Sequence, residues 1–173
     1  MILNLKIFLD ILMFSRGPQD LPSSSLLLKM IIFMNIAIGL ISVDPNVSFT
    51  VNMLFTIIYI AVTLLFIKSC LGIKDRNNGT PDLFVSRHTQ VSSSILGIHA
   101  IIALFTSMIA ISRITDESST LFIFLIVSLY AWFVNGYIFK NAFDTTMSIG
   151  LAISLLHSIA CVFVMMIFIQ VLA

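Results

Sequence analysis

The feature that most constrains the fold is a polar stretch, residues 68–90, that lies between two long apolar runs. It holds four of the chain's nine Lys and Arg residues: Lys68, Lys74, Arg76 and Arg87. Cytoplasmic loops of membrane proteins are enriched in Lys and Arg. We therefore predict that this stretch is a cytoplasmic loop and that the apolar runs on either side of it cross a membrane.

The composition supports a membrane protein and argues against a nucleic-acid binder. The chain is 59% hydrophobic and only 10% charged, with a mean hydropathy of +1.11, whereas soluble domains carry roughly 25% charged residues. The net charge is +1, and the largest basic cluster also contains Asp75 and Asp82. Phosphate binding requires clustered cations without such acids. We therefore expect the lipid bilayer, and not nucleic acid, to surround the chain.

Five apolar segments are predicted to cross the membrane as helices, because each is close to the ~20 residues that a bilayer core requires. Short polar connectors join the first to the second and the third to the fourth, so each pair forms an antiparallel hairpin. The predicted fold class is all-α, a polytopic integral-membrane helix bundle, with spans over residues 23–42, 47–67, 91–112, 121–139 and 145–171.

The N-terminal segment, residues 1–14, is apolar apart from Asn4, Lys6 and Asp10. As a helix it would be about 21 Å long, which is short of a hydrocarbon core of about 30 Å. We predict an interfacial helix on the inner leaflet. A cleaved signal peptide is the alternative, but Asp10 interrupts the apolar stretch and no small-residue cleavage pattern follows. A turn over residues 16–22, with two prolines and a glycine, ends the helix.

The basic residues test the orientation of these spans. Arg113 alone falls on the outer side of the predicted frame, and eight others fall on the inner side: Lys6, Arg16, Lys29, Lys68, Lys74, Arg76, Arg87 and Lys140. This bias predicts a cytoplasmic N-terminus and a C-terminus on the opposite side. Lys29 lies in the second turn of the first span, from which its ammonium group can reach the headgroups.

Five uncharged polar side chains fall in the middle of the spans: Asn35, Asn52, His99, Asn135 and His157. They could line a polar path through a transporter or channel, or they could form hydrogen bonds between helices, and the sequence leaves both open. His88, His99, His157 and Cys161 are metal-ligand types, but their predicted depths differ and no ligand spacing connects them. We predict no metal site and no cofactor.

Small residues recur at four-residue intervals in the third and fifth spans. Such spacing lets helix backbones approach closely and gain dispersion contacts. These spans are therefore candidates for the bundle interior, or for a face that binds a protein partner or a second copy. The packing candidates are Ser93, Gly97, Ala103, Ser107, Gly150, Ser154 and Ser158.

No arrangement of residues specifies catalysis, because the serines in the spans lack a nucleophile motif and a base. The favoured hypothesis is a non-enzymatic scaffold or accessory component of a membrane complex, and the alternative is a small transporter or channel. A third hypothesis, a lipid-modifying enzyme, requires a shared polar pocket at the inner interface, near Arg16, Asp20, Asp82, Arg87 and His88.

Two pieces of the sequence resemble a group of small inner-membrane proteins of proteobacteria. They are FLDILMFSRGPQDLP near the start and WFVNGYIFKNAFD, with the following TTMSIGLAIS, near the end. More remotely the chain resembles the Yip1-type membrane proteins, which share a five-span bundle with an inward N-terminus. The resemblance implies a bacterial inner membrane, with the C-terminus in the periplasm, and it carries over no catalytic or binding residue.

Overall fold

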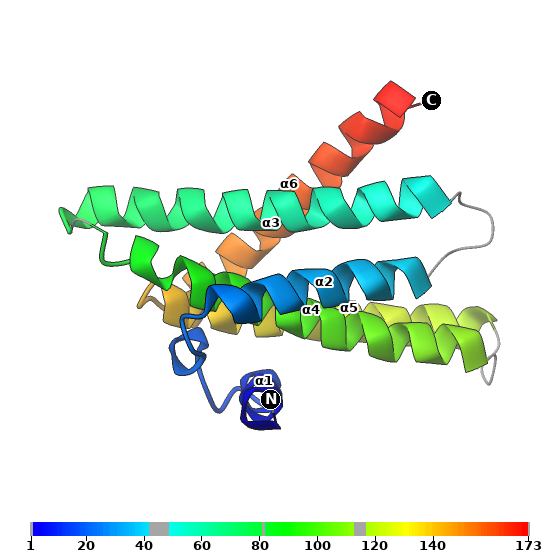
Figure 1. The fold of residues 1–173 in the computed structure, drawn as a ribbon, viewed down its shortest axis with the longest axis horizontal. Helices are drawn as coiled ribbons and strands as arrows, with labels where there is room; N and C mark the ends of the chain where they lie inside the picture. The colour runs from blue at the N-terminus through cyan, green and yellow to red at the C-terminus, as the bar shows by residue number, and fades with distance from the viewer. Residues whose placement is uncertain (1, 42–48, 81, 113–116, 173) are drawn as a thin grey trace.

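The computed structural model describes residues 2–41, 49–80, 82–112 and 117–172. Within these ranges the chain forms α-helices and short 3-10 helices and no strand, which confirms the predicted all-α bundle (Figure 1). In chain order the elements are α1 (Ile2–Leu12), η1 (Pro18–Asp20), α2 (Ser25–Ile41), α3 (Phe49–Asn78), η2 (Val85–Arg87), α4 (His88–Ser112), α5 (Glu117–Ala142) and α6 (Met147–Leu172).

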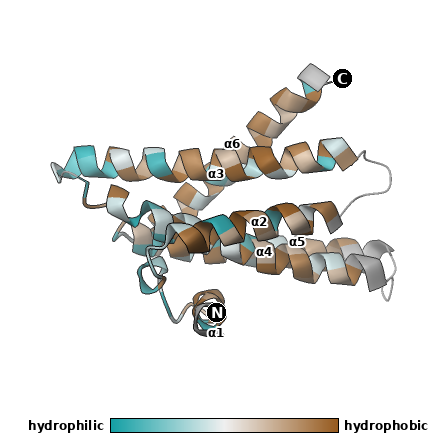
Figure 2. Cartoon of the chain, viewed as in Figure 1, coloured by the Kyte–Doolittle hydropathy of each residue, from teal (hydrophilic) through white to brown (hydrophobic). Residues whose placement is uncertain are grey.

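Four of the described helices, α3 to α6, are long and apolar enough to cross a membrane. The fifth predicted span corresponds to α2, which has 17 residues and is about 26 Å long at 1.5 Å per residue. The hydropathy colouring shows apolar residues along most of each long helix (Figure 2). These features are those of a helical membrane protein.

α1 lies across the long axis of the bundle, because Figure 1 shows it nearly end-on beside the long helices. Its residues Ile7, Phe8 and Ile11 are buried, whereas Leu9 on its other side is exposed. The hydroxyl group of Tyr130 on α5 donates a 2.6 Å hydrogen bond to the carbonyl of Leu12. α1 is therefore docked transversely against the bundle, and its position at a membrane interface stays a prediction.

The structure differs from the prediction over residues 68–90, because α3 continues as a helix to Asn78. Lys, Leu and Arg in this part are good helix formers, and Leu71 is fully buried against the bundle. Gly79 ends the helix with a φ of +64°, a conformation that glycine adopts at helix C-termini. The non-helical part of the connection is therefore much shorter than predicted.

The connectors at the opposite end, residues 42–48 and 113–116, lie outside the described residues. The polar connector predicted between the first and second spans, residues 43–46, therefore lies there entirely. Half of the one predicted between the third and fourth spans, residues 113–120, lies there too. α5 already begins at Glu117, before the predicted start of its span.

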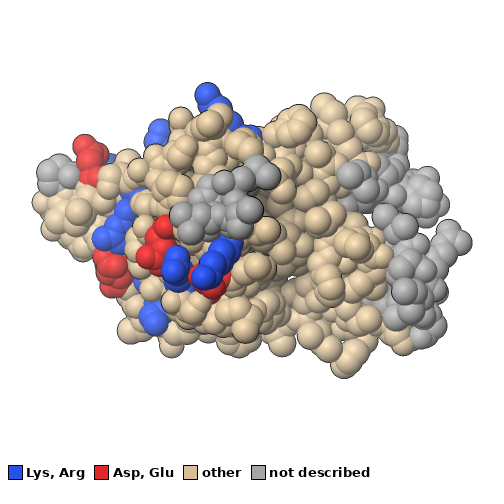
Figure 3. Space-filling model, turned by 60° about the horizontal axis from the view of Figure 1, so that its bottom comes forward, with Lys and Arg blue, Asp and Glu red and all other residues tan. Residues whose placement is uncertain are grey.

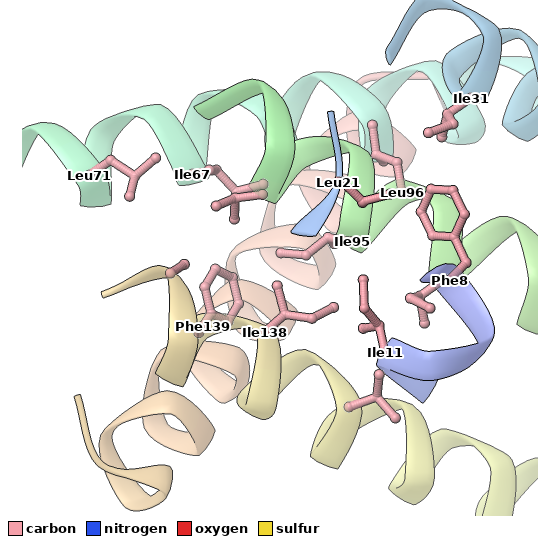
Figure 4. Packing of buried hydrophobic residues seen from close by; sticks show 14 of the residues in the cluster. Phe8, Ile11, Leu21, Ile31, Ile67, Leu71, Ile95, Leu96, Ile138 and Phe139 are labelled. Carbon is pink, nitrogen blue, oxygen red and sulfur yellow. The ribbon is translucent and has the colours of Figure 1, made fainter. Parts of the chain in front are cut away.

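α4 occupies the centre of the bundle. Val91, Ile95 and Leu96 on α4 are completely buried. In the close view, Ile95 and Leu96 lie among side chains from α3, α5 and α1 (Figure 4). α6 crosses α3, and its C-terminal end points away from the bundle (Figure 1). Large apolar side chains such as Phe163 and Met166 are exposed on that end.

Charged side chains gather toward one end of the molecule on the face drawn in Figure 3. This is the end at which α3 and α5 finish and α4 and α6 begin, and we call it the basic end. An ion pair of 2.9 Å between Arg87 and Asp144 joins two of its connections. The basic end is the one that the sequence predicts to be cytoplasmic.

Candidate functional site

A cavity of about 270 Å³ lies between α2, α3, α4 and α6, in the half of the bundle away from the basic end. Gly39 and Ala103 contribute to its wall, and a Cβ atom at Gly39 would collide with the Thr56 hydroxyl, so α2 and α3 are in close contact there. Among the described residues none that lines it is charged, and the polar ones are Asn35, Asn52, Thr56, Tyr59 and His99. The cavity is thus an uncharged polar space within otherwise apolar helices.

Asn35 fixes the orientation of His99 at the cavity wall. The amide nitrogen of Asn35 donates two hydrogen bonds of 2.9 Å, to the carbonyls of Ile31 and Leu96, so both of its hydrogens are engaged. The amide oxygen therefore remains as the acceptor for Nδ1 of His99 at 2.9 Å. In the neutral imidazole this places the proton on Nδ1 and leaves Nε2 as a hydrogen-bond acceptor.

Nε2 of His99 has no hydrogen-bond partner among the residues that the structure describes. The His99 ring lines the cavity and is not covered by neighbouring side chains. One face of the ring stacks on Tyr59 of α3, with a distance of 4.2 Å between ring centroids. The site therefore offers Nε2 of His99 as a hydrogen-bond acceptor of fixed orientation, on a ring that packs against Tyr59.

A second polar group adjoins this wall on the side toward the basic end. The Tyr59 ring contacts the ring of His157 on α6, with centroids 6.2 Å apart. Nε2 of His157 is 3.0 Å from the hydroxyl oxygen of Thr63 and 3.5 Å from the sulfur of Cys161. Both Thr63 and His157 are buried. These contacts hold α6 against α3 at the point where the two helices cross.

The structure brings together most of the polar residues that the sequence places in the middle of the spans. Asn35, Asn52 and His99 line one cavity, and His157 lies behind Tyr59 next to it. Asn135 is on α5 and is not part of the cavity lining. Tyr59 and Thr63 were missed by the sequence analysis, although their four-residue spacing on an apolar helix could have marked them as one polar face.

The small residues of α6 pack against α5 within the same chain. A Cβ atom at Gly150 would collide with the carbonyl oxygen of Gly136 and would lie 2.8 Å from the amide nitrogen of Lys140. The hydroxyl of Ser154 donates a 3.2 Å hydrogen bond to the carbonyl of Trp132. Gly136, which the sequence analysis did not select, completes this contact. The Gly150 and Ser154 face is therefore occupied and is not a free surface for a partner.

The small residues of α4 are also used inside the chain. A Cβ atom at Gly97 would collide with the ring of Phe8 on α1, and Ser93, one turn earlier, is completely buried. Ala103 lines the cavity. The hydroxyl groups of Ser107 and Ser158 donate to carbonyls one turn earlier in their own helices, at 2.6 and 3.0 Å.

The groups proposed for a lipid-modifying enzyme make separate local contacts. Arg16 pairs with Asp10 at 3.3 Å, and the carboxylate of Asp20 accepts a 2.9 Å hydrogen bond from the backbone of Gly17. Arg87 pairs with Asp144, and Nε2 of His88 is 3.2 Å from the carbonyl oxygen of Leu64. These contacts join elements at the basic end, where Nε2 of His88 also lies 3.4 Å from the hydroxyl oxygen of the buried Ser92.

The described residues contain no group of three or more His, Cys, Asp or Glu side chains placed to hold a metal ion. No protein-family model, curated protein or solved structure matches the chain.

Proposed function

We propose that the protein is a small, non-enzymatic membrane transporter that binds a small uncharged solute in the cavity between α2, α3, α4 and α6. The observation that carries this proposal is the convergence of Asn35, Asn52 and His99 on one uncharged cavity. Binding sites for small molecules are concave spaces with an apolar wall and a few polar groups that fix orientation.

The chemistry of the wall favours a solute that donates hydrogen bonds. Asn35 commits its amide hydrogens to backbone carbonyls, and His99 presents Nε2 as an acceptor. The described part of the chain provides no charged side chain at the cavity wall to neutralise an ionic solute, and an unpaired charge is costly in a low-dielectric site. The volume of about 270 Å³ is at the lower end of the range for ligand pockets, which favours a small molecule.

A scaffold that binds its partners through small-residue helix faces is less well supported than a transporter. Gly150 and Ser154 contact α5, and Gly97 contacts α1, so a partner would have to use another surface. The unequal distribution of charge supports a cytoplasmic position for the basic end, in keeping with the resemblance to bacterial inner-membrane proteins.

A swelling assay tests the transporter proposal. Liposomes that contain the purified protein are mixed with hyperosmotic glycerol, erythritol or urea, and their reswelling is followed by light scattering. We expect faster reswelling than in protein-free liposomes for at least one solute, and a return to the protein-free rate with His99→Leu. Asn135→Leu is the matched control, because Asn135 is a polar residue within a span that does not line the cavity.

Two results would contradict the proposal. One is reswelling at the protein-free rate for all three solutes, with protein that circular dichroism shows to be folded. The other is an equal loss of rate with His99→Leu and Asn135→Leu, because the cavity would then have no special role.

A further inference from the structure

A groove of about 280 Å³ separates α3 from α6 at the basic end of the bundle. The two helices are in contact where Phe66 meets His157, with ring centroids 5.2 Å apart. They cross at an angle (Figure 1), so they diverge on both sides of this contact. On the side toward the basic end, the divergence leaves the groove open between Cys70 on α3 and Ile153 on α6.

The lining of the groove changes from apolar to polar along the bundle axis. Nearest the helix crossing it consists of Cys70 and Ile153, and about one turn farther out of Ile73, Lys74 and Ile149. Farthest from the crossing it includes Asn77, Thr145 and Phe143. A phospholipid has the same order of groups, with acyl chains toward the membrane centre and a headgroup at the surface. The groove lies where the last apolar turns of α3 give way to its charged extension.

Lys74 places an uncompensated positive charge at the polar end of the groove. Neither ion pair found in the described part of the chain includes it. Its ammonium group lies over the ring of Phe84, 5.6 Å from the centroid. The neighbouring carboxylate of Asp75 is occupied elsewhere, since it accepts hydrogen bonds of 2.9 Å from the backbone N–H groups of Phe84 and Val85.

We propose that this groove binds one anionic phospholipid of the inner leaflet, with its phosphate at Lys74 and an acyl chain along Ile149 and Ile153. The basic side chain and the hydroxyl and amide groups of Thr145 and Asn77 provide partners for the headgroup. The apolar wall provides the contact for the chain. This site is separate from the solute cavity and does not depend on the transporter proposal.

Native mass spectrometry tests the site. The full chain is transferred to a mild detergent that contains equimolar phosphatidylglycerol and phosphatidylcholine, and the ratio of the two lipids that remain bound is measured. We expect the wild type to retain phosphatidylglycerol preferentially and Lys74→Gln to reduce that preference about fivefold, the contribution of a single basic residue near a membrane surface. Lys68→Gln is the matched control, because Lys68 lies on the same helix but does not line the groove.

Ile153→Trp provides an independent test, because it fills the apolar part of the groove and leaves Lys74 in place. We expect it to lower the amount of bound phosphatidylglycerol. Three results would overturn the proposal: equal retention of the two lipids by the wild type, equal effects of Lys74→Gln and Lys68→Gln, or displacement of the lipid by millimolar inorganic phosphate alone. The last would indicate a site for phosphate without an acyl chain.

Discussion

The two halves of the helix bundle are built differently. In the half toward the basic end, Ile67, Leu71, Ile95 and Phe139 are completely buried and pack against one another (Figure 4). In the other half the helices enclose a polar cavity, and α6 turns away from its neighbours. The first half holds the helices together, and the second half leaves a space of about 270 Å³ between them.

This difference has a physical basis in the connections and in the side chains of each half. At the basic end, Gln90 donates a 2.6 Å hydrogen bond to the carbonyl of Leu21, and Arg87 pairs with Asp144, so several connections are joined to one another. In a membrane, lipid is as apolar as the helix surfaces, so close packing and hydrogen bonds supply the association energy. Packing dominates in the first half, and the polar contact of Asn35 with His99 is prominent in the second.

The largest expected effect is a loss of stability on replacing a phenylalanine by alanine, which should differ between the two halves. Phe139→Ala removes a fully buried ring and leaves a void, so we expect a loss of about 3 kcal/mol in the free energy of unfolding. Phe55→Ala removes a ring that already borders the cavity, and we expect a loss below about 1 kcal/mol. Equilibrium unfolding in mixed micelles measures both. Equal losses would show that the halves are equally well packed.

The second prediction concerns the contact between α5 and α6. Gly150→Leu places a side chain against the backbone of α5, which cannot move aside without separating the helices. We expect a destabilisation of about 2 kcal/mol, the usual range for overpacking. Ala152→Leu is the control, because Ala152 is exposed on the same helix. If thermal unfolding of the two variants coincides, while a larger complex dissociates only with Gly150→Leu, the small-residue face is a partner surface instead.

A smaller effect is expected for Asn35 in the half that contains the cavity. Asn35→Leu removes the hydrogen bonds to Ile31, Leu96 and His99, and polar contacts between membrane helices contribute about 0.6 kcal/mol each on average. We expect a destabilisation of about 1 kcal/mol.

The sharper measurement for this variant is the tautomer of His99. The wild type should show the Nδ1-protonated form in nitrogen NMR spectra of the histidines, and Asn35→Leu should show a mixture of both tautomers. A wild-type ring protonated at Nε2 would contradict the orientation that Asn35 is inferred to impose.

The sequence was sufficient to predict the helical class and the membrane character of the chain. Long apolar runs separated by polar connectors are compatible with few folds other than a bundle of membrane helices. It did not reveal that α3 continues through Lys74 and Asp75. Polar residues at such a position suggest a loop, but these are compatible with a helix and Gly79 is the stronger stop signal.

The site was only partly predictable for a related reason. Asn35, Asn52 and His99 were identified as polar residues within spans, but a helix that is apolar on all sides carries no pattern that sets its rotation in the bundle. The pairing of Gly150 with Gly136, and the contact of Gly97 with Phe8, depend on which helices are neighbours. The spacing of small residues predicts a close helix contact, but it does not show whether the neighbouring helix belongs to the same chain or to a partner.

The last and smallest expected effect is local, at the connection between α3 and α4. The carboxylate of Asp75 accepts hydrogen bonds from the N–H groups of Phe84 and Val85 and from the hydroxyl of Thr80. In Asp75→Asn an NH₂ group replaces one acceptor and faces an N–H donor, so this segment should open more often. We expect trypsin to cleave at Arg87 several-fold faster, without a change in thermal unfolding. Asp82→Asn is the control, because Asn tolerates the positive φ of this exposed position.

The pH dependence of the same contact distinguishes the carboxylate from a neutral acceptor. Burial alone would raise the pKa of the Asp75 carboxyl group, but the hydrogen bonds from Phe84, Val85 and Thr80 outweigh it and hold the pKa below its usual value. A carboxyl group with a lowered pKa contributes stability above its unfolded pKa of about 3.9, and that stability is lost as the pH falls through the lower folded value. Protection of residues 82–87 from hydrogen exchange, corrected for the intrinsic rate, should therefore be constant from pH 7 to pH 5 and should fall only below about pH 4. A loss of protection between pH 7 and pH 5 would mean that another group holds the basic end together.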